Sequence, residues 1–181
     1  MNNICKQLTK LNIFVSHTHR DKNLVQRLNQ EIRKNFKNSI KLFISSDPQN
    51  STSPGEDWEK DIYKNIIDSD LMFVLITSNS KDSKWMNDEI LLAQSQQKLI
   101  IPIRINCKCK IPNRITSIQA IEDSSNYTDD FTPELFKLLK KFLSDRLESK
   151  KQDERIKKRN EQIFATVTGP YGVVLKKILK K

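Results

Sequence analysis

Glycine is scarce in this sequence. Three of the 181 residues are glycine, and Gly55 is the only one among the first 168. Nucleotide-binding loops of the GxxxxGK[ST] and GxGxxG kinds need several glycines, because the backbone must turn tightly and approach the phosphates closely. Neither pattern is present, nor is the GxSxG turn that exposes a nucleophilic serine. The sequence therefore excludes three common classes of catalytic or nucleotide-binding loop.

Cysteine and long apolar runs are scarce as well. Three cysteines, two of them Cys107 and Cys109, are too few for a disulfide framework, so we expect reduced thiols. No run of about 18 apolar residues is present, which predicts that no segment spans a membrane. The first ten residues hold no apolar stretch long enough for a signal peptide. Together these features predict a cytoplasmic protein.

Metal ligands at a recognised spacing are also missing. His17 and His19, taken with Cys107 and Cys109, offer zinc-binding side chains in principle. Alternate residues at a strand end point in opposite directions, however, and no spacing here resembles a known ligand pair. We therefore expect no metal site.

Acidic residues are outnumbered by basic ones, 22 to 32, which gives a net charge of +10. Residues 150–181 hold ten Lys or Arg and three Asp or Glu, so this segment carries +7 of that total. Because the basic character lies mostly at the C-terminal end, it does not predict a nucleic-acid-binding main domain. The last stretch, 163–181, is a basic amphipathic segment that we expect to pack on protein rather than on a membrane surface.

The sequence is rich in short β-branched runs, which alternate with amphipathic helical patterns. The predicted strands are residues 11–16, 40–45, 70–78, 98–105 and 117–121. The longer runs are apolar almost throughout, as expected for a parallel sheet with helices on both faces. The pattern predicts an α/β fold, a flavodoxin-like doubly wound sheet of about five parallel strands over 11–146. Residues 147–181 are predicted to form a basic helical extension.

Polar loops follow the first three predicted strands: SHTHRD, SSDPQNSTSPGEDW and TSNSKDSKW. Ligands of doubly wound sheets bind beyond the carboxyl ends of the strands, where such loops meet helices. The third loop leads directly into a helix that carries Glu89 about one turn from its start. From spacing alone, Glu89 is either a carboxylate beside the ligand crevice or an ordinary charge on the helix surface.

Three blocks of the sequence resemble the Toll/interleukin-1 receptor (TIR) domain, particularly its bacterial branch. They are IFVSHTHRDKNLVQRL, then LFISSDP followed by SPGEDWEKDI, then SDLMFVLITSNSKDSKWMNDEI. SPGEDW resembles the BB loop of the family. SKWMNDEI fits the pattern S-x-W-x-x-x-E-[LI], whose glutamate is catalytic in the members that cleave NAD+. The resemblance assigns that role to Glu89 and makes Trp85 the tryptophan of the motif.

This resemblance implies an NAD+ glycohydrolase or ADP-ribosyl cyclase, with NAD+ as substrate and no resident cofactor. Nicotinamide leaves NAD+ as a neutral molecule, so one carboxylate that stabilises the positive ribose suffices. Ribose or phosphate groups are expected to be held by Ser16, Ser46, Asp47, Ser78 and Asn79. A ring is expected to stack on Phe14 or on an aromatic side chain of a neighbouring subunit. His17 and Trp85 complete the predicted substrate-binding residues. Two alternatives stay open. His17 or His19 either shapes substrate or product preference or simply faces solvent, and Trp85 either serves the site or packs beneath its helix.

The functional expectation that follows is signal production in bacterial antiphage defence, as in Thoeris systems. The product would be a cyclic ADP-ribose or a related nucleotide that a separate effector protein recognises. Self-association through TIR surfaces is expected as well. The alternatives are an enzyme that depletes NAD+, and a non-catalytic TIR module that docks on another protein in virulence or as a scaffold.

Overall fold

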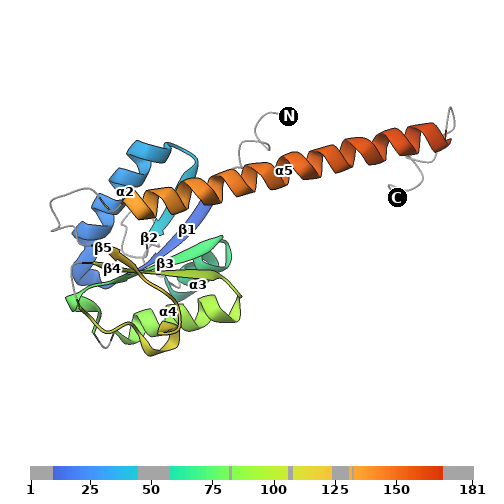
Figure 1. Ribbon diagram of the computed structural model, residues 1–181. Helices are drawn as coiled ribbons and strands as arrows, with labels where there is room; N and C mark the ends of the chain where they lie inside the picture. Colours follow the sequence, from blue (N-terminus) through green and yellow to red (C-terminus); the bar gives the residue numbers. More distant parts are fainter. Residues whose placement is uncertain are drawn as a thin grey trace. The chain divides into compact units, whose positions relative to one another are not determined.

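The computed structural model spans residues 1–181 and describes residues 10–44, 58–81, 83–105, 108–123, 131 and 133–168 (Figure 1). Its described strands form one parallel sheet in the order β2-β1-β3-β4-β5. The strands are β1 (Leu11–Ser16), β2 (Ile40–Ile44), β3 (Leu71–Ile76), β4 (Leu99–Ile105) and β5 (Ile121–Asp123). The predicted α/β fold with five parallel strands is confirmed.

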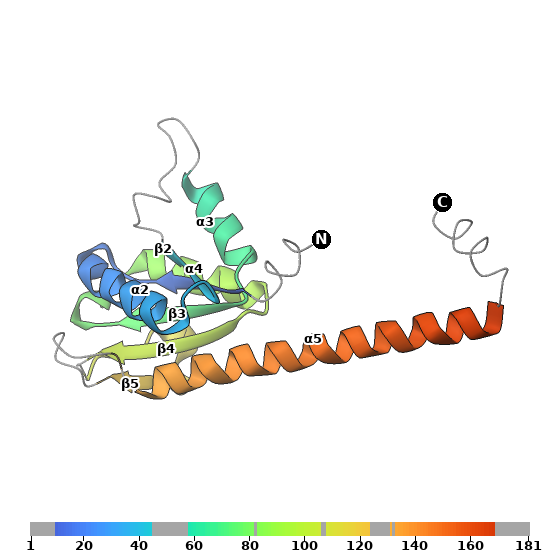
Figure 2. The same ribbon diagram turned by 90° about the horizontal axis from the view of Figure 1, so that it is seen from above.

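Helices cover both faces of this sheet. Figures 1 and 2 show α2 on one face and α3 and α4 on the other. The helices are α2 (Lys22–Phe36), α3 (Trp58–Ile67), α4 (Lys84–Ser95) and α5 (Pro133–Thr168), and short 3-10 helices lie at η1 (His19–Asp21), η3 (Ser78–Ser80) and η4 (Asn113–Ile115). The first turns of α5 lie against α2, because the rings of Phe36 and Phe136 stack with centroids 6.0 Å apart.

The central strand β3 explains why the sheet forms. All six of its side chains are buried, as expected for a strand with helices on both faces. Alternate residues face opposite ways along a strand, and Met72, Val74 and Ile76 belong to the apolar cluster beneath α3 and α4. Phe14 of β1 and Ile90 of α4 join the same cluster. This packing fixes α4 over the neighbouring strands β1 and β3.

The fifth strand lies later than the sequence predicts. The expected strand 117–121 is wrong except at its last residue, because β5 is Ile121–Asp123. Residues 113–118 instead form η4 and a turn, in which the Ile118 N–H donates to the Ile115 carbonyl at 3.0 Å. Ile118 packs against the core from this turn. A partly buried apolar side chain in a turn thus follows the same sequence pattern as a strand residue.

The C-terminal part of the chain is helical. The chain divides into two compact units, Met1–Leu139 and Lys140–Lys181, and α5 continues through Arg146 without a break as far as Thr168. The expected domain boundary between 146 and 147 stays a prediction. Among the described residues, no helix has the length and apolarity needed to cross a membrane.

Candidate functional site

Helix α4 begins where the third polar loop ends. Ser83 has an extended backbone and its hydroxyl accepts a hydrogen bond from the Met86 N–H at 3.4 Å, which makes it the N-cap. The Asn87 amide donates to the Ser83 carbonyl at 3.1 Å. This start places Trp85 and Glu89 four residues apart, on one face of the first two turns.

The carboxylate of Glu89 is buried, with only 2% of the residue exposed. The Ser16 hydroxyl, at the carboxyl end of β1, donates to Oε2 at 2.5 Å. The Trp85 indole Nε1–H donates to Oε1 at 2.8 Å. Each carboxylate oxygen therefore has its own donor, one from the sheet and one from the same helix.

Burial raises the pKa of Glu89 from 4.5 to about 7. Desolvation is the dominant cause, because a carboxylate loses its hydration when it is buried among apolar side chains. The hydrogen bonds from Ser16 and Trp85 favour the charged form and lower the pKa, but they offset only part of this effect. Near neutral pH the group therefore exists in both protonation states.

A second polar cluster surrounds Asp21, which is buried with 4% exposure. Its Oδ2 accepts hydrogen bonds from the hydroxyls of Thr18 at 2.6 Å and Thr77 at 2.8 Å. Its Oδ1 accepts from the Asn79 amide at 2.7 Å. Asp21 thereby ties the loop after β1 to the loop after β3, the two loops that flank the Glu89 contact.

His17 is also buried, with 4% exposure, and His19 is exposed. The Nδ1 of His17 lies 3.1 Å from the Val15 carbonyl. Burial lowers the pKa of His17 below 6.5, although the Val15 hydrogen bond and the Asp21 charge oppose this. Of the two expected alternatives for His17, a solvent-facing side chain is wrong.

The structure brings together three of the residues that the sequence singled out: Ser16, Trp85 and Glu89 are in direct hydrogen-bond contact. The two alternatives for Trp85 do not exclude each other, because its ring also packs against the apolar cluster. Asn79 lies apart from this contact, on Asp21.

Three more residues were expected to bind the ligand: Phe14, Ser46 and Asp47. Phe14 is corrected to a core residue, because it is 1% exposed and packs among Ile62 and Ile66 of α3. Its ring is not available for stacking on a ligand. Ser46 and Asp47 lie outside the described residues.

Sequence reasoning missed Asp21 as a residue of this region. The residue stands in SHTHRD, a loop that was noted for its short polar side chains. Its partners Thr77 and Asn79 are more than fifty positions away in the sequence. The only signal available was therefore its membership of a polar loop at a strand end.

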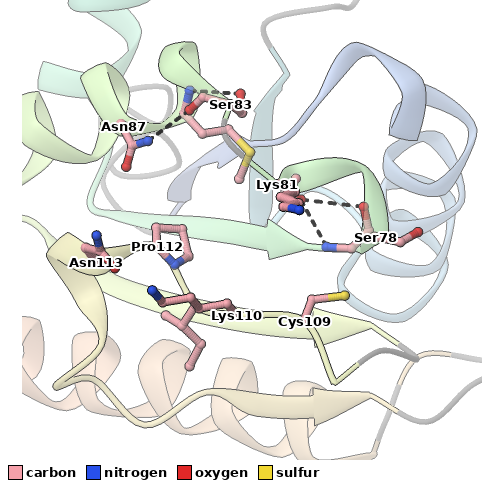
Figure 3. Close-up of a pocket in the computed structure, with 12 residues that line it drawn as sticks. Ser78, Lys81, Ser83, Asn87, Cys109, Lys110, Pro112 and Asn113 are labelled. Atoms are coloured by element: carbon pink, nitrogen blue, oxygen red, sulfur yellow. Dashed lines mark hydrogen bonds between the residues drawn. The ribbon is translucent and has the colours of Figure 1, made fainter.

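A pocket of about 620 Å³ lies beside α4 (Figure 3). Its lining residues come from the loop after β3 with the start of α4, and from the connection after β4: Thr77, Ser78, Ser80, Lys81, Ser83, Met86, Asn87, Cys109, Lys110, Ile111, Pro112 and Asn113. Ser78 is the one predicted site residue among them. Glu89 and Trp85 do not line this pocket, so it is distinct from the Glu89 contact.

Cys109, which lines this pocket, is disulfide-bonded. The two other cysteines of the chain, Cys5 and Cys107, lie outside the described residues. The expectation of reduced thiols is therefore wrong for Cys109. That expectation came from the number of cysteines, whereas pairing depends on which sulfurs the fold brings together. Within the described part of the chain, no group of three or more His, Cys, Asp or Glu is placed to hold a metal ion.

A parallel sheet in the order 2-1-3-4-5, with a buried carboxylate beneath its carboxyl ends, defines a flavodoxin-like α/β domain with a polar site at the strand ends. The TIR domain family matches residues 13–139, well over half of the chain. The chain therefore belongs to the TIR domain family. Comparison with curated proteins finds no match.

Several solved structures are similar to this chain. The TIR domain of the Toll-related receptor TRR-2 from Hydra magnipapillata is 18% identical, and the match covers 61% of this chain and 82% of that one with a TM-score of 0.49. The Clostridium botulinum CMP N-glycosidase BcmB is 17% identical over 61% of this chain and 84% of its own, with a TM-score of 0.41. The TIR domains of the activated Roq1 resistosome, which directly recognizes the effector XopQ, are 16% identical over 94% and 98%, with a TM-score of 0.43. At these TM-scores the three similarities carry no functional argument.

Proposed function

We propose that this TIR domain cleaves NAD+ between nicotinamide and ribose, with Glu89 as the catalytic residue. The observation that carries the proposal is the buried Glu89 carboxylate, held by Ser16 and Trp85 below the strand ends. Its position in the S-x-W-x-x-x-E-[LI] pattern matches that of the glutamate in NAD+-cleaving relatives. A carboxylate with these surroundings is rare as a purely structural feature, because its burial is costly.

The reaction requires little from the protein beyond a negative charge close to the ribose carbon. The carbon–nitrogen bond breaks with both electrons going to nicotinamide, which leaves as a neutral molecule without needing an acid. The ribose carbon becomes positively charged, and the Glu89 carboxylate stabilises it through space. Water then adds to that carbon and loses a proton to give ADP-ribose, or a nucleophile of the same molecule adds to give a cyclic product.

Access to the carboxylate requires an opening step, because Glu89 is almost fully covered. A ribose hydroxyl is an O–H donor like Ser16, so it can replace the Ser16 hydroxyl at Oε2 with little loss of hydrogen bonding. Trp85 would keep its bond to Oε1 and hold the carboxylate in place. Ser16 is thus the partner that the substrate displaces, and Trp85 is the residue that positions Glu89.

This role requires the ionised form of Glu89, and a pKa of about 7 leaves that form available near neutral pH. A carboxylate that is poorly solvated interacts more strongly with a developing positive charge than one in bulk water. The same desolvation leaves part of the enzyme protonated at neutral pH. We therefore expect cleavage to become faster as pH rises through about 7.

The biological setting that we propose is bacterial antiphage defence of the Thoeris kind, where the product acts as a signal. A separate effector protein would bind an ADP-ribose-derived, cyclic product. Self-association through TIR surfaces would complete or activate the site. The second enzymatic candidate is depletion of NAD+. Analysis of the products distinguishes depletion from signal production.

The test is incubation of the purified protein with NAD+ at high protein concentration, followed by chromatography and mass spectrometry of the products. Glu89→Gln should lower nicotinamide release by about 10²–10³-fold. Asp88→Asn is the matched control, because this neighbouring carboxylate on α4 is exposed, and it should retain wild-type turnover. ADP-ribose as sole product would indicate depletion, and a cyclic product would indicate signalling. No nicotinamide release under any condition would overturn the enzymatic proposal in favour of an interaction module.

A further inference from the structure

The pocket beside α4 is lined by other residues of the helix than those of the Glu89 contact. Residues of an α-helix are about 100° apart around its axis, so Asn87 is turned well away from Trp85 and Glu89, whereas Met86 lies between the two directions. Met86 and Asn87 line the pocket, whereas Trp85 and Glu89 bond to each other on the β1 side. The start of α4 therefore contributes to two polar sites at the same edge of the sheet, through different residues.

Two segments face one another across this pocket. Figure 3 shows Ser78, Lys81, Ser83 and Asn87 along one side, with Cys109, Lys110, Pro112 and Asn113 along the other. The first row follows β3 and the second follows β4. The pocket thus lies beyond the carboxyl ends of two adjacent parallel strands, where doubly wound folds bind ligands. Its volume of about 620 Å³ is in the range of small-molecule sites.

The described part of the lining carries positive charge. Lys81 and Lys110 contribute it from opposite sides, and none of the lining residues that the structure describes is Asp or Glu. Both lysines are exposed, and neither forms a salt bridge with any residue that the structure describes. Two lysine side chains at one pocket favour an anionic ligand.

The rest of the lining divides into apolar and hydrogen-bonding parts. Ile111 and Pro112, which are half-buried, supply an apolar surface against which a flat ring can pack, and the buried Met86 lies beside them. The exposed Ser78 hydroxyl and the side-chain amides of Asn87 and Asn113 supply donors and acceptors, whereas the hydroxyls of Thr77 and Ser80 donate to Asp21 and to the Leu75 carbonyl. An inorganic anion would leave the apolar surface unused, and an uncharged apolar compound would leave the lysines without a partner. A ring, a hydroxylated sugar and a phosphate in one molecule would use all three parts.

We propose that this pocket is a second ligand site and that it binds a nucleotide. The base packs on Ile111 and Pro112, and the phosphates lie between Lys81 and Lys110. The site is separate from the one proposed for NAD+ cleavage, because Glu89 does not line it. The inference therefore stands whether or not the protein turns over NAD+.

The test is titration of the full chain with ADP, monitored by calorimetry, in the Glu89→Gln background to prevent any turnover. The double variant Lys81→Ala/Lys110→Ala should weaken ADP binding by about tenfold or more, because both phosphate partners are lost. The matched control is Lys84→Ala/Lys108→Ala, which removes the same charge from two exposed lysines that flank the pocket without lining it. This control should change the affinity by no more than about twofold. Equal weakening by both pairs would show non-specific attraction and overturn the proposal.

The location of bound ADP is checked by NMR of the methyl groups of Met86 and Ile111 and the indole N–H of Trp85. The proposal expects saturable shifts of the two methyl signals and little change at Trp85. Shifts confined to Trp85 would place ADP in the Glu89 site and overturn the proposal. Adenosine and pyrophosphate, tested separately, should each bind more weakly than ADP. Absence of ADP binding up to about 10 mM would also overturn the proposal.

Discussion

Burial of the Glu89 carboxyl should make the stability of the domain depend on pH in a way that Glu89→Gln abolishes. Below about pH 4.5 this carboxyl is protonated in both the native and the unfolded chain. Between pH 4.5 and about 7 the unfolded chain gives up the proton while the native protein keeps it. The free energy of unfolding therefore falls as pH rises through this window, and it levels off above about pH 7.

The size of the effect follows from the two pKa values. The difference between 4.5 and about 7 corresponds to ~3 kcal/mol lost from the free energy of unfolding. The glutamine side chain of the Glu89→Gln variant has no proton to lose, and its amide can accept from Trp85 and donate to Ser16. Burial also lowers the pKa of His17, but His17 is the same in both proteins, so its contribution cancels from their difference. The difference between wild type and variant therefore isolates Glu89.

The assay is urea unfolding at several pH values, monitored by tryptophan fluorescence. Trp58 and Trp85, the only tryptophans, both belong to the first compact unit, so the signal reports on the TIR unit. Between pH 4.5 and about 8, the free energy of unfolding of the variant should rise by ~3 kcal/mol relative to that of the wild type. Parallel stability curves for the two proteins would refute the reasoning, because they would mean that Glu89 has an ordinary pKa.

Three further substitutions test the contacts around the site. Ser16→Ala removes the donor to Oε2 and should raise the pKa of Glu89 above its wild-type value, as measured by NMR titration of the carboxyl carbon. Trp85→Phe keeps a ring but removes the donor to Oε1, so it should raise the same pKa and slow NAD+ cleavage without unfolding the domain. Asp21→Asn should cost ~1–3 kcal/mol in chemical unfolding, since an amide cannot accept all three of its hydrogen bonds, whereas Asp88→Asn should cost little. An unchanged pKa in the first two variants, or equal losses in the last two, would contradict the hydrogen bonds described.

Most of the sheet could be predicted from sequence because its longer strands carry their own signal. The run 71–76 is apolar at every position and buried at every position. The short strand β5 lacks such a signal, since Glu122 in its middle is exposed and forms a salt bridge with Arg104 at 3.2 Å. Ile118, which suggested a strand, owes its burial to a turn that packs on the core.

The candidate site shows the same division between local and long-range information. The contact between Trp85 and Glu89 follows from a four-residue spacing on one helix. The bond from Ser16 joins residues 73 positions apart, so it depends on how α4 packs over β1. Phe14 and Ser16 share one face of β1, yet one is covered by α3 and the other meets Glu89. Sequence periodicity shows which residues share one face of a strand. It does not show which helix or side chain packs against each of them.

The most direct test of the central claim is the initial rate of nicotinamide release from NAD+ between about pH 5 and about pH 9. If the ionised Glu89 carboxylate carries the reaction, the wild-type rate should rise with pH through a midpoint near 7 and then level off. The Glu89→Gln protein should stay low and show no such rise. A Glu89→Gln protein as active as the wild type, or a wild-type rate that is the same on both sides of pH 7, would contradict the account.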